Sequence, residues 1–126
     1  MKILLVDDDA FLRDMYAMKF GELGHTIDAA DTGESAIAKL TGGTYDVILM
    51  DMIMPGMNGI ELLKQIKSAK IGGAPACIML SNQSEEADIR ASLDAGASGY
   101  IVKAKLIPSE VVAEVLRIVS TNNNTI

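Results

Sequence analysis

The stretch ILLVDDD, residues 3–9, places four apolar residues directly before three aspartates. The stretch VILMD, residues 47–51, repeats this arrangement with a single aspartate at its end. Continuous apolar runs of this length, rich in Ile, Leu and Val, are typical of strands in a parallel sheet that is covered on both faces. The two stretches therefore predict buried parallel strands whose carboxyl ends carry acidic side chains.

Short apolar runs and segments with helical spacing alternate along the rest of the chain. The pattern predicts strands over residues 3–6, 26–30, 47–50, 76–80 and 99–102, and helices over residues 10–23, 33–40, 58–68, 85–95 and 108–119. Thr32 and Ser84 are suited to N-cap the second and fourth helices, and Pro108 is suited to open the last. Five such units with right-handed crossovers predict a doubly wound α/β fold, a five-stranded parallel sheet between two layers of helices. We place the domain at residues 1–120 and a polar tail at residues 121–126.

The composition of the 126-residue chain narrows its class. Hydrophobic residues make up 49% and charged residues 22%, which is a globular balance. The net charge of −6 argues against direct contact with nucleic acid. One cysteine and one histidine exclude a disulfide framework and disfavour a His/Cys metal site. No apolar run approaches the ~18 residues of a membrane span and the N-terminal run is too short for a secretory signal, so we expect a cytoplasmic protein without membrane insertion.

Polar residues follow the apolar runs at the carboxyl ends of the strands, where open parallel sheets bind their ligands. The first strand is followed by Asp7, Asp8 and Asp9, the third by Asp51, the fourth by Ser81 and the fifth by Lys103. If the fold is as predicted, these residues converge on one rim of the sheet. Asp9 is equally suited to capping the helix that follows it.

A cluster of carboxylates on that rim restricts the chemistry. Two carboxylates about 4 Å apart repel each other by about 4 kcal/mol at an effective dielectric constant of about 20, so the cluster must take up a proton or hold a cation. Oxygen ligands without His or Cys favour Mg²⁺, with Mn²⁺ as the possible substitute. A lysine and a hydroxyl beside the metal provide for phosphoryl oxygens, and a carboxylate can then act as the nucleophile and form an aspartyl phosphate.

These residues resemble the receiver domain of two-component response regulators, including the stand-alone form that acts in chemotaxis. The matching stretches are ILLVDDD at residues 3–9, YDVILMDMIMPGMNG at residues 45–59 and AGASGYIVK at residues 95–103, and the match spans essentially the whole chain. The resemblance implies a flavodoxin-like (βα)5 fold with strand order 2-1-3-4-5. It also implies a signalling switch rather than an ordinary enzyme, with chemistry limited to its own phosphorylation and dephosphorylation.

The resemblance implies a role for each acidic residue. Asp51 would be the phosphoacceptor and would attack the phosphohistidine of a sensor histidine kinase or of a histidine phosphotransfer protein. Asp8, Asp51 and the backbone carbonyl of Ile53 would bind Mg²⁺ directly. Asp7 would assist the metal through a water molecule.

The resemblance also assigns the groups around the phosphoryl oxygens. Lys103 would pair with the phosphoryl group, and Ser81 would donate its hydroxyl to it. Tyr100 would be the aromatic switch that turns inward when Ser81 moves. Pro55 and Gly59 would shape the loop after the third strand. A phosphoryl group adds about −1.5 to −2 charges. Because Ser81 and Lys103 lie on different strands, a phosphoryl group that draws both inward can bias a surface with two alternative arrangements.

Two partner surfaces are predicted, one near the site and one for the output. The first helix carries a second apolar set, Phe11, Met15 and Met18, where the resemblance places the kinase, and Met54 lies next to the site. Methionine adapts well to partners, although local packing explains these residues equally well. The output face would be the fourth helix, fifth strand and fifth helix. Its effector is unknown, and the domain would be a monomer or a phosphorylation-dependent dimer.

The sequence departs from the family after the last strand. Lys103 is usually followed by a proline in a cis peptide, but Ala104 stands here. A cis bond to a non-proline residue costs about 2.5–4 kcal/mol, so we expect either a trans bond with a re-routed loop at residues 105–106 or a strained cis bond. Beside the expected path of the hydrolytic water, Gln83 could orient that water and the apolar Ile53 could not.

Three other functions share part of this pattern. A phosphatase of the haloacid-dehalogenase type shares the Asp-x-Asp pattern, but it expects Thr or Val where Phe11 stands. A flavodoxin-like electron carrier would need a phosphate loop rich in Ser, Thr and Gly, and this turn is acidic. A phosphorylation-independent interaction module is the serious alternative. Only Ala104 favours it, because the acidic residues, Ser81 and Lys103 are all kept.

Overall fold

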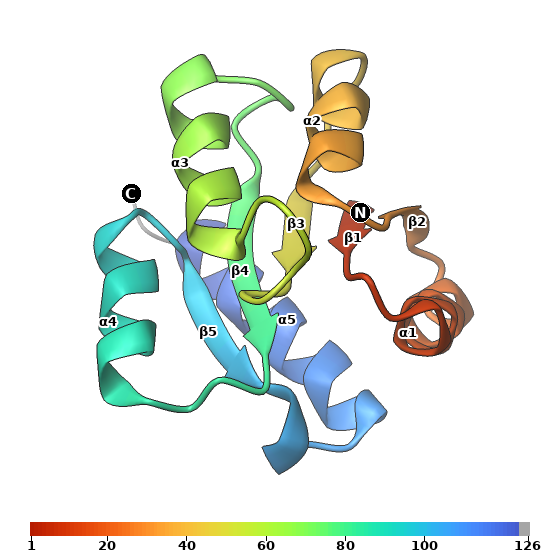
Figure 1. The fold of residues 1–126 in the computed structure, drawn as a ribbon. Coiled ribbons are helices and arrows are strands. Elements are labelled where there is room, and N and C mark those ends of the chain that lie inside the picture. Colours follow the sequence, from red (N-terminus) through yellow and green to blue (C-terminus); the bar gives the residue numbers. More distant parts are fainter. Residues whose placement is uncertain (124–126) are drawn as a thin grey trace.

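Five parallel strands form one sheet in the order β2-β1-β3-β4-β5, as predicted. The computed structural model describes residues 1–123, with side chains through residue 121 (Figure 1). Its elements are β1 (Lys2–Val6), α1 (Ala10–Glu22), β2 (Thr26–Ala30), α2 (Gly33–Thr41), β3 (Val47–Met50), α3 (Gly59–Ala69), β4 (Ala76–Ser81), α4 (Glu86–Asp94), β5 (Gly99–Val102), the 3-10 helix η1 (Lys103–Lys105) and α5 (Pro108–Asn123). Helices α1 and α5 share one face, α2 and α3 the other, and α4 lies beside β5. No described helix is both long and apolar enough to span a bilayer.

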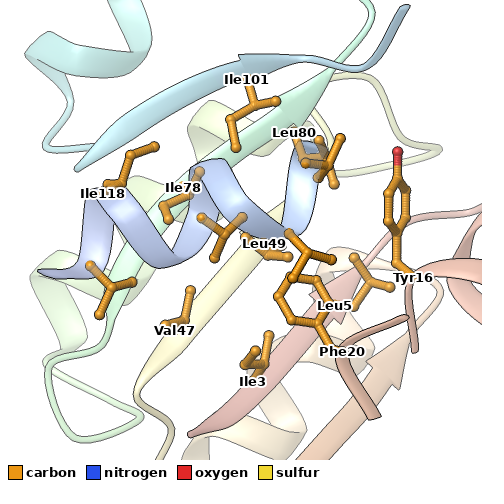
Figure 2. Close-up of a cluster of buried hydrophobic side chains, with 14 residues drawn as sticks. Ile3, Leu5, Tyr16, Phe20, Val47, Leu49, Ile78, Leu80, Ile101 and Ile118 are labelled. Carbon is orange, nitrogen blue, oxygen red and sulfur yellow. The ribbon is translucent and has the colours of Figure 1, made fainter. Parts of the chain in front are cut away.

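Successive buried side chains of the central strands lie on opposite faces of the sheet. On β1, Ile3 and Leu5 pack with α1 and α5, a cluster that Figure 2 shows in close-up. Leu4 and Val6 pack with α2 and α3 on the other face. Because successive strand residues point to opposite sides, a strand covered by both helix layers must be apolar throughout. Each fully buried large side chain contributes about 1.5–3 kcal/mol, so these runs fix the position of the strand ends that follow them.

The two predicted N-caps have different outcomes. Thr32 caps α2, since its hydroxyl accepts a hydrogen bond from a backbone N–H of the first turn. The prediction that Ser84 caps α4 is wrong, because the N-cap is Glu85 and its side chain makes no capping bond. The backbone before α4 is held elsewhere: the N–H of Gln83 donates to the hydroxyl of Ser81 at 3.3 Å. This turn delays the start of the helix.

The segment after β5 takes the first of the two predicted courses. The Lys103–Ala104 peptide is trans, and the chain turns at once into η1, with the N–H of Leu106 donating to the carbonyl of Lys103 at 3.3 Å. Helix α5 then runs to Asn123, past the predicted start of the polar tail. Residues 124–126 of that tail lie outside the described residues.

Candidate functional site

The carboxyl ends of β1, β3, β4 and β5 meet at one rim of the sheet (Figure 1). Asp7 follows β1, Asp51 follows β3, Ser81 ends β4 and Lys103 follows β5. One carboxylate oxygen from each of Asp7, Asp8 and Asp51 lies within 4.8 Å of the other two. The sequence therefore predicted this convergence correctly, and it follows from the parallel topology alone.

Lys103 joins the two most buried carboxylates of this cluster. Its Nζ lies 2.7 Å from Oδ2 of Asp7 and 3.0 Å from Oδ2 of Asp51. The side chains of Lys103, Asp7 and Asp51 are 8%, 3% and 13% exposed. Breaking a buried pair by removing one partner leaves an uncompensated charge and typically costs about 3–5 kcal/mol. One ammonium group among three carboxylates still leaves a net negative site, which favours a cation.

The carboxylates determine the protonation of Lys103. Burial by itself would lower the pKa of Lys103, but hydrogen bonds from the ammonium group to Asp7 and Asp51 and the charges of both carboxylates outweigh it. The pKa is raised above its usual value, so Lys103 is charged throughout the physiological range. The site therefore holds a charged ammonium group beside Asp7 and Asp51.

Asp7 is fixed by hydrogen bonds on every side. Its N–H donates to the carbonyl of Ala30 at 3.1 Å, which extends the β1–β2 pairing by one step. Its Oδ1 accepts from the N–H of Asp9 at 2.9 Å, and its Oδ2 accepts from Lys103. Its backbone carbonyl accepts from Nη1 of Arg13 at 2.7 Å. Asp7 is therefore rigidly placed, and Arg13, on the first turn of α1, belongs to the surroundings of the site.

The loop after β3 turns back tightly beneath Asp51. The N–H of Ile53 donates to Oδ1 of Asp51 at 3.3 Å, and the N–H of Gly59 donates to the carbonyl of Met52 at 2.9 Å. A Cβ atom added at Gly59 would lie 2.3 Å from the carbonyl oxygen of Asp51, closer than any real contact. Only glycine fits there, so the start of α3 presses directly on the backbone of Asp51.

Ser81 and Tyr100 form a second connected group at the rim. The hydroxyl of Tyr100 donates to the carbonyl of Gln83 at 2.6 Å and contacts Sδ of Met52 at 3.5 Å. Burial raises the pKa of Tyr100, and a hydrogen bond with Ser81 offsets part of that rise. Tyr100 is therefore partly buried in this structure and links β5 to the residues that follow β4 and β3.

Sequence reasoning missed two groups that α1 contributes. Arg13 looked like an ordinary surface residue, because a single basic residue on a helix carries no positional signal. Tyr16 is a buried member of the core cluster of Figure 2, and an apolar position on a helix predicts no more than that. The pKa of Tyr16 is raised, chiefly by burial. The charge of Lys103 lowers this pKa and the charge of Asp7 raises it, so both charged groups of the site act on the Tyr16 hydroxyl.

The predicted partner residues divide into exposed and buried ones. Phe11 is 74% exposed and Met18 is 65% exposed. Met15 is partly buried against the α1/α5 cluster. Met54 is only 7% exposed and lies in the core between the sheet, α2 and α3, which favours the packing interpretation over partner contact for this residue. Ile107, which the sequence did not single out, is 61% exposed at the start of α5.

The donors on the rim fit a divalent cation of the magnesium type. Asp7, Asp8 and Asp51 offer only carboxylate oxygens, and these are close enough to share one ion. Hard oxygen ligands suit Mg²⁺ or Mn²⁺. Asp8 is exposed, so an ion held there would keep a side open to solvent and to a phosphoryl group. The backbone N–H of Ile53 beside Asp51 places this residue at the same edge.

Comparison with known proteins agrees with the fold. Residues 3–115 match the family model described as the response regulator receiver domain. The chain is 43% identical over 114 residues to the transcriptional regulatory protein ResD of Bacillus subtilis, covering 90% of this chain and 46% of ResD. It is 38% identical over 106 residues to the gliding motility regulatory protein of Myxococcus xanthus, covering 84% of this chain and 14% of that protein. The chain thus spans less than half the length of both relatives.

Solved structures with the same architecture cover nearly the whole chain. The chemotaxis protein CheY4 of Vibrio cholerae superposes with a TM-score of 0.85 at 27% identity, covering 93% of this chain and 97% of that one. A two-component response regulator from Clostridium difficile gives 0.88 at 27% identity, covering 98% and 99%. The regulator TrrA of Thermotoga maritima, solved in complex with Mg²⁺ and BeF, gives 0.80 at 32% identity, covering 93% and 97%.

Proposed function

The chain belongs to the response regulator receiver domain family, and from that premise we propose that it accepts a phosphoryl group on Asp51. Receiver domains are signalling switches of two-component systems and not ordinary enzymes. The observation that carries the proposal is the contact of Asp51 with Lys103, 3.0 Å away, inside a cluster of three carboxylates. A carboxylate so placed can be a nucleophile, with a fixed cation ready for the charge that arrives.

In the proposed reaction an oxygen of Asp51 attacks phosphorus in line with the donor nitrogen. The O–P bond forms as the P–N bond breaks, and the electron pair of the broken bond returns to the imidazole of the donor. Lys103 then moves from Asp51 to the phosphoryl oxygens, where its ammonium group neutralises part of the negative charge that the phosphoryl group brings. Hydrolysis of the aspartyl phosphate would restore the carboxylate of Asp51. The partly buried Gln83 would orient the attacking water.

The metal-binding part of the proposal concerns the acidic rim. Asp8, Asp51 and the backbone carbonyl of Ile53 would hold Mg²⁺, and Asp7 would act through water. When bound, the ion supplies Lewis-acid charge that offsets the repulsion between the carboxylates and the phosphoryl oxygens. Mn²⁺ has the same ligand preference and would replace it. Asp7, tied to Lys103 and Asp9, keeps its orientation throughout.

The switch in the proposal involves Ser81 and Tyr100. Ser81 is almost fully buried at the end of β4 and would donate its hydroxyl to the phosphoryl group. Tyr100 already contacts Gln83 and Met52, so a shift of the β4 end changes the space that its ring occupies. Such a movement would bias the surface formed by α4, β5 and α5 between two arrangements.

We place the phosphodonor, a sensor histidine kinase or a histidine phosphotransfer protein, on the rim above Asp51. Three exposed apolar side chains follow strands of this rim in sequence: Phe11 after β1, Ile53 after β3 and Ile107 between β5 and α5. Each follows a different strand end, so together they form a contact surface around the acidic site. The α4–β5–α5 face would bind a separate output partner. The curated relatives do not identify that partner, because they are longer proteins of which this chain spans less than half.

The test is the intact mass of the chain after incubation with Mg²⁺ and acetyl phosphate. We expect the parent to gain one phosphoryl group, and the gain to be absent in Asp51→Asn and in the presence of a chelator. The alternative of a phosphorylation-independent module predicts no gain in a folded parent that binds Mg²⁺. Ala104 no longer favours that alternative, because Lys103 reaches both carboxylates with alanine after it.

A further inference from the structure

We propose that Arg13 is a positioning residue for the metal-binding turn formed by residues 7–9. This inference deepens the proposed function and rests on it. In outline, the guanidinium group holds the peptide between Asp7 and Asp8, and so directs the carboxylate of Asp8 into the acidic cluster. Arg13 touches neither the metal nor the phosphoryl group in this role.

The first observation is where the sheet hydrogen bonds stop. Strand β1 pairs with both neighbours through Val6, whose carbonyl accepts from the N–H of Asp51 at 3.0 Å. The N–H of Asp7 is still used, by the carbonyl of Ala30. The carbonyl of Asp7 lies beyond this pairing, and Nη1 of Arg13 donates to it at 2.7 Å. A side chain therefore takes over where the strand pairing ends.

The second observation is how the turn itself is held. Asp7 is fixed through its carboxylate by Asp9 and Lys103, and Asp9 is fixed as the N-cap of α1. Asp8, between them, is exposed, so its direction is set by the two peptides that flank it. Arg13 holds the first of these peptides. Without it, the peptide can rotate and the carboxylate of Asp8 leaves the cluster for part of the time.

Electrostatics alone predicts the opposite effect on metal binding. A guanidinium group near the cluster repels a divalent cation, so removing its charge should strengthen Mg²⁺ binding. Loss of positioning should weaken it, because groups that orient metal ligands typically contribute about 10- to 100-fold to affinity. The sign of the change therefore distinguishes a positioning residue from a bystander charge.

The experiment measures Mg²⁺ affinity by calorimetry on the whole chain, in Arg13→Ala and Arg13→Met. The methionine variant keeps most of the aliphatic stem, so it retains packing if the alanine variant is poorly folded. We expect both variants to bind Mg²⁺ about 10-fold more weakly. Lys19→Ala is the matched control, since it removes the same charge from the exposed face of α1, 4.0 Å from Glu22, and should leave the affinity within about two-fold.

A second readout needs no metal. The N–H of Asp9 donates to Asp7 across the turn, so its hydrogen exchange should become faster in both Arg13 variants and stay unchanged in the Lys19 control. Unchanged or tighter Mg²⁺ binding, or unchanged exchange at Asp9, overturns the inference. A parent that binds Mg²⁺ but gains no phosphoryl group overturns the proposed function instead. The two failures are distinguishable, because Mg²⁺ affinity and hydrogen exchange in the Arg13 variants are measured without a phosphodonor.

Discussion

At the scale of single residues, three consecutive aspartates meet three different environments. Asp7 is buried and paired with Lys103. Asp9 caps α1, accepting from the N–H groups of Phe11 and Leu12 at 2.9 and 3.3 Å. Asp8 stays exposed between them, with an oxygen in the acidic cluster. The sequence alone left open whether Asp9 is a cap or a ligand, and the structure assigns it to the helix.

Asp8→Asn should make the metal-free domain more stable. Removing one carboxylate from the cluster relieves repulsion of about 1 kcal/mol for an exposed group, since one lysine cannot neutralise three acids. The same variant should lose the stabilisation that Mg²⁺ gives the parent, because a ligand stabilises only the state that binds it. Urea unfolding with and without Mg²⁺ measures both effects.

The matched control for this prediction is Asp14→Asn, an exposed acid on α1 outside the cluster. It should change stability by less than about 0.5 kcal/mol and leave the Mg²⁺ effect intact. A destabilised Asp8→Asn variant, or one that Mg²⁺ stabilises as strongly as the parent, would contradict the assignment of Asp8 to the metal.

At the scale of elements, the start of α3 sets the position of the loop that carries Asp51. Gly59→Ala should lower the free energy of unfolding by about 1–3 kcal/mol and slow phosphorylation from acetyl phosphate, because the new methyl group must push the Asp51 backbone away. The clash is with a carbonyl oxygen at 2.3 Å, so no side-chain movement relieves it. Urea unfolding and intact mass over time give the two quantities.

Gly21 provides the control on another helix. A Cβ atom at Gly21 of α1 meets nothing within 4 Å, so Gly21→Ala should stabilise the domain by about 0.5–1 kcal/mol through helix propensity. If both alanine variants behave alike, the close approach of Gly59 to Asp51 does not position the loop.

A second tie between elements lies at the edge of the sheet. The hydroxyl of Tyr45, just before β3, donates to Oδ2 of Asp28 on β2 at 2.6 Å. Burial, and then the hydrogen bond to Asp28 and its charge, raise the pKa of Tyr45 to about 12. The folded state therefore keeps this proton at a pH where the unfolded chain, with a pKa of about 10, has lost it. The stabilisation is complete below pH 10 or so and disappears as the pH rises through about 12.

Tyr45→Phe should lower the free energy of unfolding by about 1.5 kcal/mol at pH 8, where the bond to a charged acceptor is intact. Above pH 10 or thereabouts the parent should lose stability more steeply than the variant, so the difference narrows. Urea unfolding at several pH values from 8 to 11 tests this. A constant difference in the free energy of unfolding between parent and variant across that range would show that folding does not raise the pKa of Tyr45.

At the scale of the whole molecule, the topology explains how much the sequence could predict. Two helix layers require apolar residues on both faces of each central strand. The residue that directly follows such an apolar run therefore lies at the rim of the sheet. Asp7, Asp51, Ser81 and Lys103 could be placed together for this reason, although they are far apart in the chain. The order of strands came from the family resemblance, since local patterns do not encode it.

The parts that sequence could not predict depend on how loops pack. Met54 reads the same in sequence whether it faces a partner or the core, and its burial depends on how the loop after β3 packs. Ser84 precedes a good helix pattern, but the turn between Ser81 and Gln83 delays the helix. Arg13 gains its significance from one carbonyl at the end of β1. Each depends on a contact between segments with no repeating pattern.

The central claim is that Asp51, and not one of its acidic neighbours, carries the phosphoryl group. The direct measurement is chemical trapping: the chain is treated with acetyl phosphate and Mg²⁺, reduced with borohydride, which converts an aspartyl phosphate into homoserine, and sequenced by mass spectrometry of its peptides. We predict homoserine at position 51 and unmodified aspartate at positions 7, 8 and 9. Homoserine at any of those three positions, or at none in a folded chain that binds Mg²⁺, would contradict the account.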